Sequence, residues 1–97
     1  MEDKVPKSTL AIGNKVGLHA RPASLFVNTA QKFPCKITVR NITTESNSAN
    51  AKSILGILSL GVKQDHTIEI ETEGDQGDEA LLALITLVEG NFGEKKN

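Results

Sequence analysis

The chain has 97 residues, 38% of them hydrophobic and three aromatic, with a formal net charge of −1. Its longest apolar runs are too short to span a bilayer, its first residues lack a signal peptide's apolar stretch, and the single cysteine excludes an internal disulfide. Few aromatics and no basic cluster argue against nucleic-acid binding. We therefore expect one cytoplasmic domain over residues 1–97, without membrane insertion and with frayed ends at 1–7 and 93–97.

The charges are unevenly distributed along the chain. Residues 1–48 contain seven Lys or Arg and three Asp or Glu, whereas residues 49–97 contain four and nine. This asymmetry favours docking of a basic-rimmed surface in the first half onto an acidic partner.

The first predicted elements are a strand over residues 8–14 and a helix over residues 20–33. Leu10 and Ile12 alternate with polar residues in the strand. Apolar residues recur at three- and four-residue spacing along one face of the helix, at Ala20, Ala23, Val27 and Ala30. Pro22 lies in the first turn, where its missing N–H costs nothing, and Gly17 lets the incoming backbone turn sharply.

His19 stands where this helix begins, which suggests phosphate chemistry. The unpaired N–H groups of a first turn and the helix dipole favour an anion, and Arg21 adds a positive fork. A neutral imidazole is a good nucleophile near pH 7. The alternative is a histidine that only caps or packs, but the flanking glycine and arginine favour a phosphate carried on the ring itself.

Two further strands are predicted over residues 36–40 and 67–71. Apolar side chains alternate with polar ones in both, at Ile37, Val39, Ile68 and Ile70. Each strand therefore has one buried face, which indicates a sheet covered by helices on one side. Together with the helices this pattern predicts a two-layer α+β sandwich.

Two more helices complete the predicted elements. The helix over residues 53–60, closed by Gly61, is apolar nearly all round, so some side chains should stay exposed as a docking patch. The residues assigned to that patch are Ile54, Leu55, Ile57 and Leu58. The last helix spans residues 78–89 and has one apolar face, formed by Leu81, Leu84, Ile85 and Val88. Asp75 or Asp78 is expected to cap it and Gly90 to end it.

Two segments resemble a known family. Residues 17–23, Gly-Leu-His-Ala-Arg-Pro-Ala, resemble the active-site segment of HPr, the histidine-containing phosphocarrier of the sugar phosphotransferase system. Residues 50–61, Asn-Ala-Lys-Ser-Ile-Leu-Gly-Ile-Leu-Ser-Leu-Gly, resemble the family's second signature, which carries a regulatory serine. The segments follow the family's order, and the resemblance extends from Thr9 to Phe92.

The resemblance implies a complete fold. It adds a strand over residues 46–51, which gives the order β-α-β-β-α-β-α. The implied architecture is an open-faced two-layer sandwich: a four-stranded antiparallel sheet in the order 1-4-2-3 with three helices on one face. A monomer is expected from the size of the chain and from the family.

The resemblance also implies a phosphoryl relay. His19 would accept a phosphoryl group from a phosphohistidine of Enzyme I, charged by phosphoenolpyruvate, and pass it to the IIA component of a sugar permease. Arg21 would pair with the phosphate, the N–H groups of Ala20 and Arg21 would donate to it, and Gly17 and Pro22 would shape the turn. Such a protein is a carrier rather than an enzyme, and no cofactor or metal is expected.

Ser53 has two compatible interpretations. A serine at the start of a helix is an ordinary N-cap. The resemblance implies that it is also a phosphorylation site for HPr kinase/phosphorylase, with a catabolite-control regulator as a further partner. A phosphate there would add charge beside the docking patch and weaken pairing with Enzyme I, and Lys52 could pair with it.

Several alternatives remain at this stage. The segment from Asn41 to Asn50 is longer than the family's common hairpin and, like residues 89–94, resembles the nitrogen-linked branch of phosphocarriers; residues 52–54 and 59–61 favour the sugar branch. A purely regulatory HPr-like protein typically lacks the histidine, and a small-ligand-binding domain gives the segment around His19 no purpose. His66, in a polar turn, is interpreted as solvated.

Overall fold

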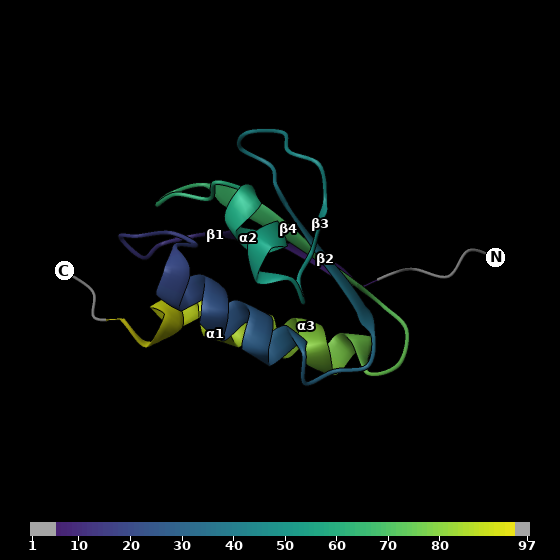
Figure 1. The fold of residues 1–97 in the computed structure, drawn as a ribbon. Coiled ribbons are helices and arrows are strands. Elements are labelled where there is room, and N and C mark those ends of the chain that lie inside the picture. The colour runs from purple at the N-terminus through teal and green to yellow at the C-terminus, as the bar shows by residue number, and fades with distance from the viewer. Residues whose placement is uncertain (1–5, 95–97) are drawn as a thin grey trace.

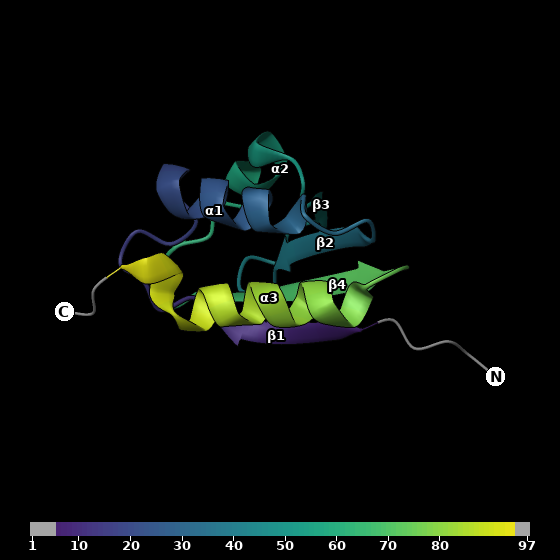
Figure 2. The same cartoon turned by 90° about the horizontal axis from the view of Figure 1, so that it is seen from below.

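The computed structural model describes residues 6–94, which form a four-stranded antiparallel sheet in the order β1-β4-β2-β3 with helices on one face (Figures 1 and 2). The strands are β1 (Lys7–Ala11), β2 (Lys36–Asn41), β3 (Ala49–Asn50) and β4 (Thr67–Glu73). The helices are α1 (Ala20–Ala30), α2 (Ile54–Ser59) and α3 (Gly77–Glu89), followed by the short 3-10 turn η1 (Asn91–Gly93). The predicted α+β class, the element order and the strand order are confirmed.

The alternation of the central strands determines which face the helices cover. In β2 and β4 every second side chain is buried, at Ile37, Val39, Asn41, Ile68, Ile70 and Thr72. Val39 lies opposite Ile70 in the antiparallel register, so the buried positions of the two strands share one face. Phe26, Leu84 and Ile57 come from the three helices and close the core over that face.

Two helix ends differ from the predictions. Helix α1 ends at Ala30 rather than at Phe33, because the chain then tightens into i→i+3 bonds, one of which joins Phe33 N–H to Ala30 O at 3.2 Å. Helix α3 is not capped by Asp75 or Asp78. Its N-cap is Gln76 in the left-handed conformation (φ 64°), without a side-chain bond, and Asp78 lies in the first turn. Gly90 is the C-cap, as expected.

Two strands are shorter than expected. Strand β1 ends at Ala11, and Ile12 N–H donates instead to His66 O at 2.8 Å, outside the sheet. Strand β3 is reduced to two residues, which pair with Thr38 and Val39 of β2. The preceding segment is organised by Asn41, whose N–H donates to Ser46 Oγ at 2.9 Å and whose Oδ1 accepts from Thr44 N–H at 3.3 Å.

The expectation of frayed ends is wrong for the residues that the structure describes. Lys7 belongs to β1, and Pro6 O accepts from Thr72 N–H at 2.9 Å. At the other end, Gly93 closes η1 and Glu94 contacts the loop after β1. Residues 1–5 and 95–97 lie outside the described part. None of the helices in residues 6–94 is long and apolar enough to cross a membrane.

His66 is not simply solvated, which corrects the sequence interpretation. Its Nδ1 accepts from Lys63 N–H at 3.2 Å and lies 3.1 Å from Asn41 Nδ2. Because a backbone N–H can only donate, Nδ1 is the unprotonated nitrogen in this arrangement. The same Asn41 Nδ2 donates to Leu60 O at 3.1 Å, so His66 helps to fix the end of α2 against the sheet.

Candidate functional site

The loop that carries His19 is fixed against the segment after α2. Asp65 N–H donates to Ile12 O at 2.7 Å, and Leu18 N–H donates to Val62 O at 3.0 Å. Gly17 lies at the closest approach with φ +62°, and a Cβ placed there would be 2.3 Å from Val62 O. Any side chain at this position would therefore push the loop away from its support.

His19 is the N-cap residue of α1. Its backbone is extended (φ −84°, ψ −168°), and its carbonyl accepts the first helical bond from Ala23 N–H at 2.8 Å. The exposed imidazole makes no capping bond. Within residues 6–94, no acceptor takes the N–H groups of Ala20 and Arg21, and Pro22 has none. The ring and two free donors thus lie together at the positive end of a helix.

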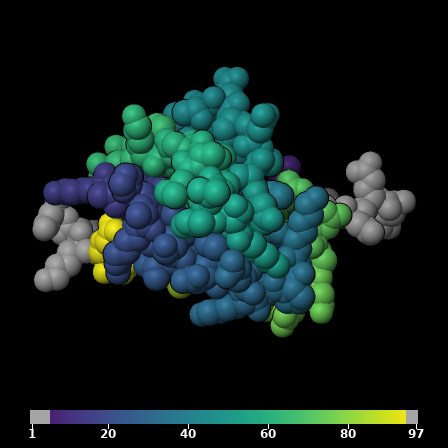
Figure 3. All heavy atoms as spheres, viewed as in Figure 1, coloured from purple at the N-terminus to yellow at the C-terminus, as the bar shows by residue number. Residues whose placement is uncertain are grey.

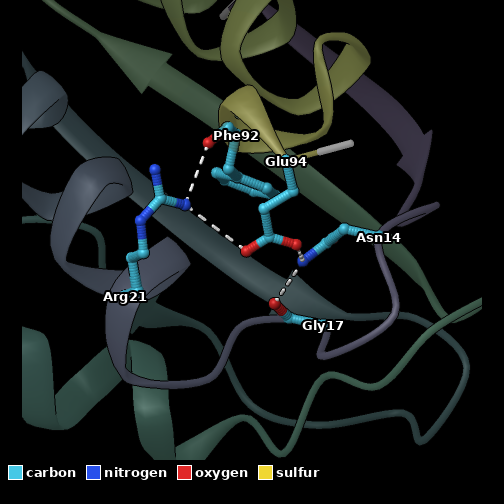
Figure 4. Close-up of polar contacts among 5 residues, drawn as sticks. All are labelled: Asn14, Gly17, Arg21, Phe92 and Glu94. Atoms are coloured by element: carbon cyan, nitrogen blue, oxygen red, sulfur yellow. Dashed lines mark hydrogen bonds and ion pairs between the residues drawn. The ribbon is translucent and has the colours of Figure 1, made fainter. Parts of the chain in front are cut away.

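Arg21 lies in this first turn and faces the C-terminal end of the described chain. Its Nη1 donates to Phe92 O at 3.2 Å and lies 3.5 Å from Glu94 Oε2 (Figure 4). A cation at a helix N-terminus opposes the macrodipole, and helix α1 has no acidic residue in its first turn to offset it. This arrangement costs stability unless an anion approaches, and Glu94 supplies one from outside the helix.

Asn14, which the sequence analysis missed, connects Glu94 with the loop that carries His19. Its Nδ2 donates to Gly17 O at 2.9 Å and to Glu94 Oε1 at 3.3 Å (Figure 4). The side chain is buried, and its Oδ1 has no partner among the described residues. An asparagine three residues before a glycine turn is a position that favours such local bonds, and this was the available indication.

Glu94 reaches the site because η1 reverses the chain. Asn91, Phe92 and Gly93 are all left-handed, with φ of 54°, 56° and 76°. Asparagine tolerates this conformation; for Phe92 it costs about 1–2 kcal/mol, which is offset by about 1.5–3 kcal/mol from burying the ring. Phe92 is 1% exposed, so the core holds the turn in place. Phe92 directly precedes residues 93–97, which were expected to fray, and an aromatic residue at that boundary was the available indication that the chain packs beyond α3.

A second region lies at the start of α2. Ser53 is its N-cap, and Ser53 Oγ accepts from Gly56 N–H at 3.0 Å. Lys52 does not point to that hydroxyl, since its Nζ donates to Phe33 O at 2.6 Å. A groove of about 600 Å³ separates α1 from α2 and is lined by both, including Ser24, Asn28, Ser53 and Leu55.

Helix α2 exposes three apolar side chains, of which Ile54 and Leu55 line this groove. Leu55, Leu58 and Ile54 are 76%, 39% and 37% exposed, which confirms that part of the helix faces solvent. Ile57 is fully buried, so its assignment to the docking patch is wrong: it is the residue by which α2 packs on the core. In Figure 3 the teal atoms of α2 lie beside the blue atoms of α1 on one face.

The described residues hold no group of three or more His, Cys, Asp or Glu side chains placed to bind a metal ion. At the start of α1, an exposed imidazole lies beside backbone N–H groups that can donate to an anion. Such a site can take a phosphoryl-sized anion on or next to the ring.

Comparisons with known proteins agree with this fold and site. The family model described as "PTS HPr component phosphorylation site" matches residues 6–90. The phosphocarrier protein HPr of Pseudomonas aeruginosa is 38% identical over 91 residues, covering 93% of this chain and 98% of its own. A crystal structure of HPr from Thermoanaerobacter tengcongensis superposes with a TM-score of 0.88 at 48% identity, covering 94% of this chain and 99% of that one.

A longer relative is the multiphosphoryl transfer protein of Haemophilus influenzae. It is 41% identical over 86 residues, and this chain covers only 17% of its length. The fold and the family model together define a domain of the phosphotransferase system. Within that system the chain belongs to the HPr family of phosphocarrier proteins.

Proposed function

We propose that this chain relays a phosphoryl group through His19, from a phosphohistidine of Enzyme I to the IIA component of a sugar permease. The observation that carries the proposal is the geometry of the first turn of α1: an exposed, unbonded imidazole at the N-cap, followed by the free N–H groups of Ala20 and Arg21. A helix N-terminus stabilises a dianion moderately, so the group can leave again.

The transfer balances as an exchange between two imidazoles. A ring nitrogen of His19 attacks the phosphorus of the donor's phosphohistidine, so one P–N bond forms while another breaks. The second nitrogen of His19 then loses its proton, and the donor ring, which keeps the electron pair of the broken bond, takes up a proton. Arg21 neutralises charge on the phosphoryl oxygens.

The docking surface of this proposal is the exposed side of α1 and α2. Ile54, Leu55 and Leu58 offer apolar contacts beside the groove, and Ser24 and Asn28 offer polar ones. Exposed apolar side chains next to a reactive group favour a protein partner. We assign this surface to Enzyme I and to the IIA component, with the protein acting as a cytoplasmic monomer.

We further propose that phosphorylation of Ser53 regulates this docking. A phosphate on Ser53 Oγ would lie at the N-terminus of α2 and at the edge of the groove. Lys52 would have to release Phe33 O to pair with it. The kinase would be HPr kinase/phosphorylase, and a catabolite-control regulator would recognise the modified surface.

The sugar branch is our choice over the nitrogen-linked branch. It rests on the sequence around Ser53 and Gly61. The segment from Asn41 to Asn50 follows β2, and among residues 6–94 no hydrogen bond joins it to His19 or Arg21. The loop therefore affects the choice of partner rather than the chemistry at His19.

Phosphorus NMR after incubation with Enzyme I and phosphoenolpyruvate tests the relay. We expect an acid-labile phosphoramidate signal in the wild-type protein and none in His19→Ala. The matched control is His66→Ala, which removes the other histidine and should leave the signal in place. A signal of undiminished size in His19→Ala would overturn the assignment. Absence of a signal from wild type with a competent Enzyme I would favour the nitrogen-linked donor.

A further inference from the structure

We infer that Glu94 is a positioning residue for Arg21. The carboxylate of Glu94 holds the guanidinium of Arg21 in the unphosphorylated protein, and it is displaced when His19 carries a phosphoryl group. The inference rests on the proposed phosphoryl relay. Glu94 lies beyond the stretch matched by the family model, which ends at residue 90. The contact between Arg21 and Glu94 is a feature of this chain outside the matched stretch.

The carboxylate of Glu94 joins two parts of the site at once. One oxygen accepts from Asn14 Nδ2 at 3.3 Å, and the other lies 3.5 Å from Arg21 Nη1 (Figure 4). The same Nη1 donates at 3.2 Å to Phe92 O, so the turn supplies both a carbonyl and a carboxylate to Arg21. Arg21 is thus aimed by the C-terminal turn rather than by its own helix.

The strained backbone of this turn supports a specific role for Glu94. Asn91 and Phe92 both keep left-handed conformations; asparagine tolerates this conformation, whereas for phenylalanine it is unfavourable, and the buried ring of Phe92 maintains it. Residues held in such conformations persist only where the surrounding structure fixes them. As a result, the Glu94 side chain, which is 25% exposed, points from the turn toward Asn14 and Arg21.

The ion pair between Arg21 and Glu94 is long and exposed, so Arg21 can exchange Glu94 for another anion. Charge-assisted N–H···O bonds are usually about 2.7–2.9 Å, well below the 3.5 Å found between Arg21 and Glu94. A phosphoryl dianion on His19 would offer Arg21 more charge and three oxygens. It would also repel the carboxylate of Glu94, which bears the same sign. Arg21 therefore has one partner before transfer and another after it.

This exchange predicts a shift in the phosphoryl equilibrium. Glu94→Gln removes the competing charge while its amide oxygen still accepts from Asn14. Since exposed ion pairs contribute little, we expect the equilibrium between phospho-Enzyme I and this protein to move about two- to fivefold toward the phosphorylated carrier. The shift should shrink toward none in about 1 M salt, because salt screens exposed charges. Glu73→Gln, at the far end of β4, is the matched control for net charge and should give no shift.

Side-chain ¹⁵N NMR of Arg21 gives the decisive readout. Before phosphorylation, the Arg21 signals of wild type and Glu94→Gln should differ; after phosphorylation they should coincide, because neither protein then pairs Arg21 with residue 94. Glu94→Ala should shift the equilibrium as Glu94→Gln does. A difference that survives phosphorylation, or a shift in Glu94→Ala alone, would overturn the inference. A wild-type protein that takes up no phosphoryl group would instead overturn the relay on which the inference rests.

Discussion

At the scale of single residues, Arg21 illustrates how a side chain can be electrostatically unfavourable for its own helix and still be held in a defined position. It places a positive charge at the positive end of α1, and 63% of the side chain is exposed to water. Its contacts are to Phe92 and Glu94, more than 70 positions later in the chain. The role we propose for it as an anion partner follows from its position beside His19, but its contacts with Phe92 and Glu94 could not be predicted, because no local pattern encodes contacts over such a separation.

Replacement of Arg21 tests its proposed role as the partner of the phosphate. We expect Arg21→Ala to slow phosphoryl uptake at His19 by tenfold or more, an order-of-magnitude figure of about 1.4 kcal/mol or above for a lost charge-assisted bond to phosphate. Stability should change little, since an exposed ion pair is worth about 0–1 kcal/mol. Rapid-quench labelling measures the rate, and urea unfolding followed by circular dichroism measures stability. Labelling at the wild-type rate, or loss of folding, would contradict this role.

At the scale of elements, the sequence patterns located α1, α2 and α3 and three of the four strands of the described residues. The ends of these elements were set by contacts. Helix α3 begins from a left-handed Gln76 although two aspartates were available nearby. Strand β3 could not be found from its small polar residues, and it is only two residues long. Helix α2 is the converse case: its apolar sequence predicted exposure correctly, yet Ile57, the buried residue within Ile54–Ser59, was assigned to the surface.

The start of α2 allows capping and charge to be separated. Ser53→Ala should cost about 0.5–2 kcal/mol, because Gly56 N–H loses its acceptor. Asp and Asn also cap helices well, so Ser53→Asp and Ser53→Asn should both retain most of the stability. Only Ser53→Asp adds charge beside the docking surface, and only this variant should accept phosphoryl groups from Enzyme I more slowly. Equal rates for the Asp and Asn variants would argue against control by charge at this position.

At the scale of the whole molecule, the C-terminal turn completes both the core and the site. Phe92 is buried among residues of the hydrophobic core, and its carbonyl binds Arg21. The sequence patterns predicted a two-layer sandwich from β1 to α3, and residues 93–97 were expected to be a frayed end outside it. The patterns that predict helices and strands do not register a three-residue left-handed turn, which explains why this part of the fold was missed.

Truncation of the Phe92 ring should therefore affect stability and transfer together. We expect Phe92→Ala to lower the free energy of unfolding by about 3–5 kcal/mol, as for other buried aromatic side chains. Leu82→Ala, on the exposed side of α3, is the control and should change it by about 0.5 kcal/mol or less. Under conditions where Phe92→Ala remains folded, its phosphoryl uptake should also fall. A stability loss no larger than that of the Leu82 variant would mean that the turn is not part of the core.

The contact between Lys52 and Phe33 has a consequence for local opening of the structure. Lys52 Nζ donates to Phe33 O, and Gln31 Nε2 donates to Lys52 O at 3.1 Å, so the end of α1 and the residue before Ser53 hold each other in both directions. Neither segment can open without releasing the other. Amide hydrogens at the end of α1 and the start of α2 should therefore exchange with solvent as one cooperative unit. A charge placed on Ser53 should therefore change hydrogen exchange at the end of α1 as well as at the start of α2.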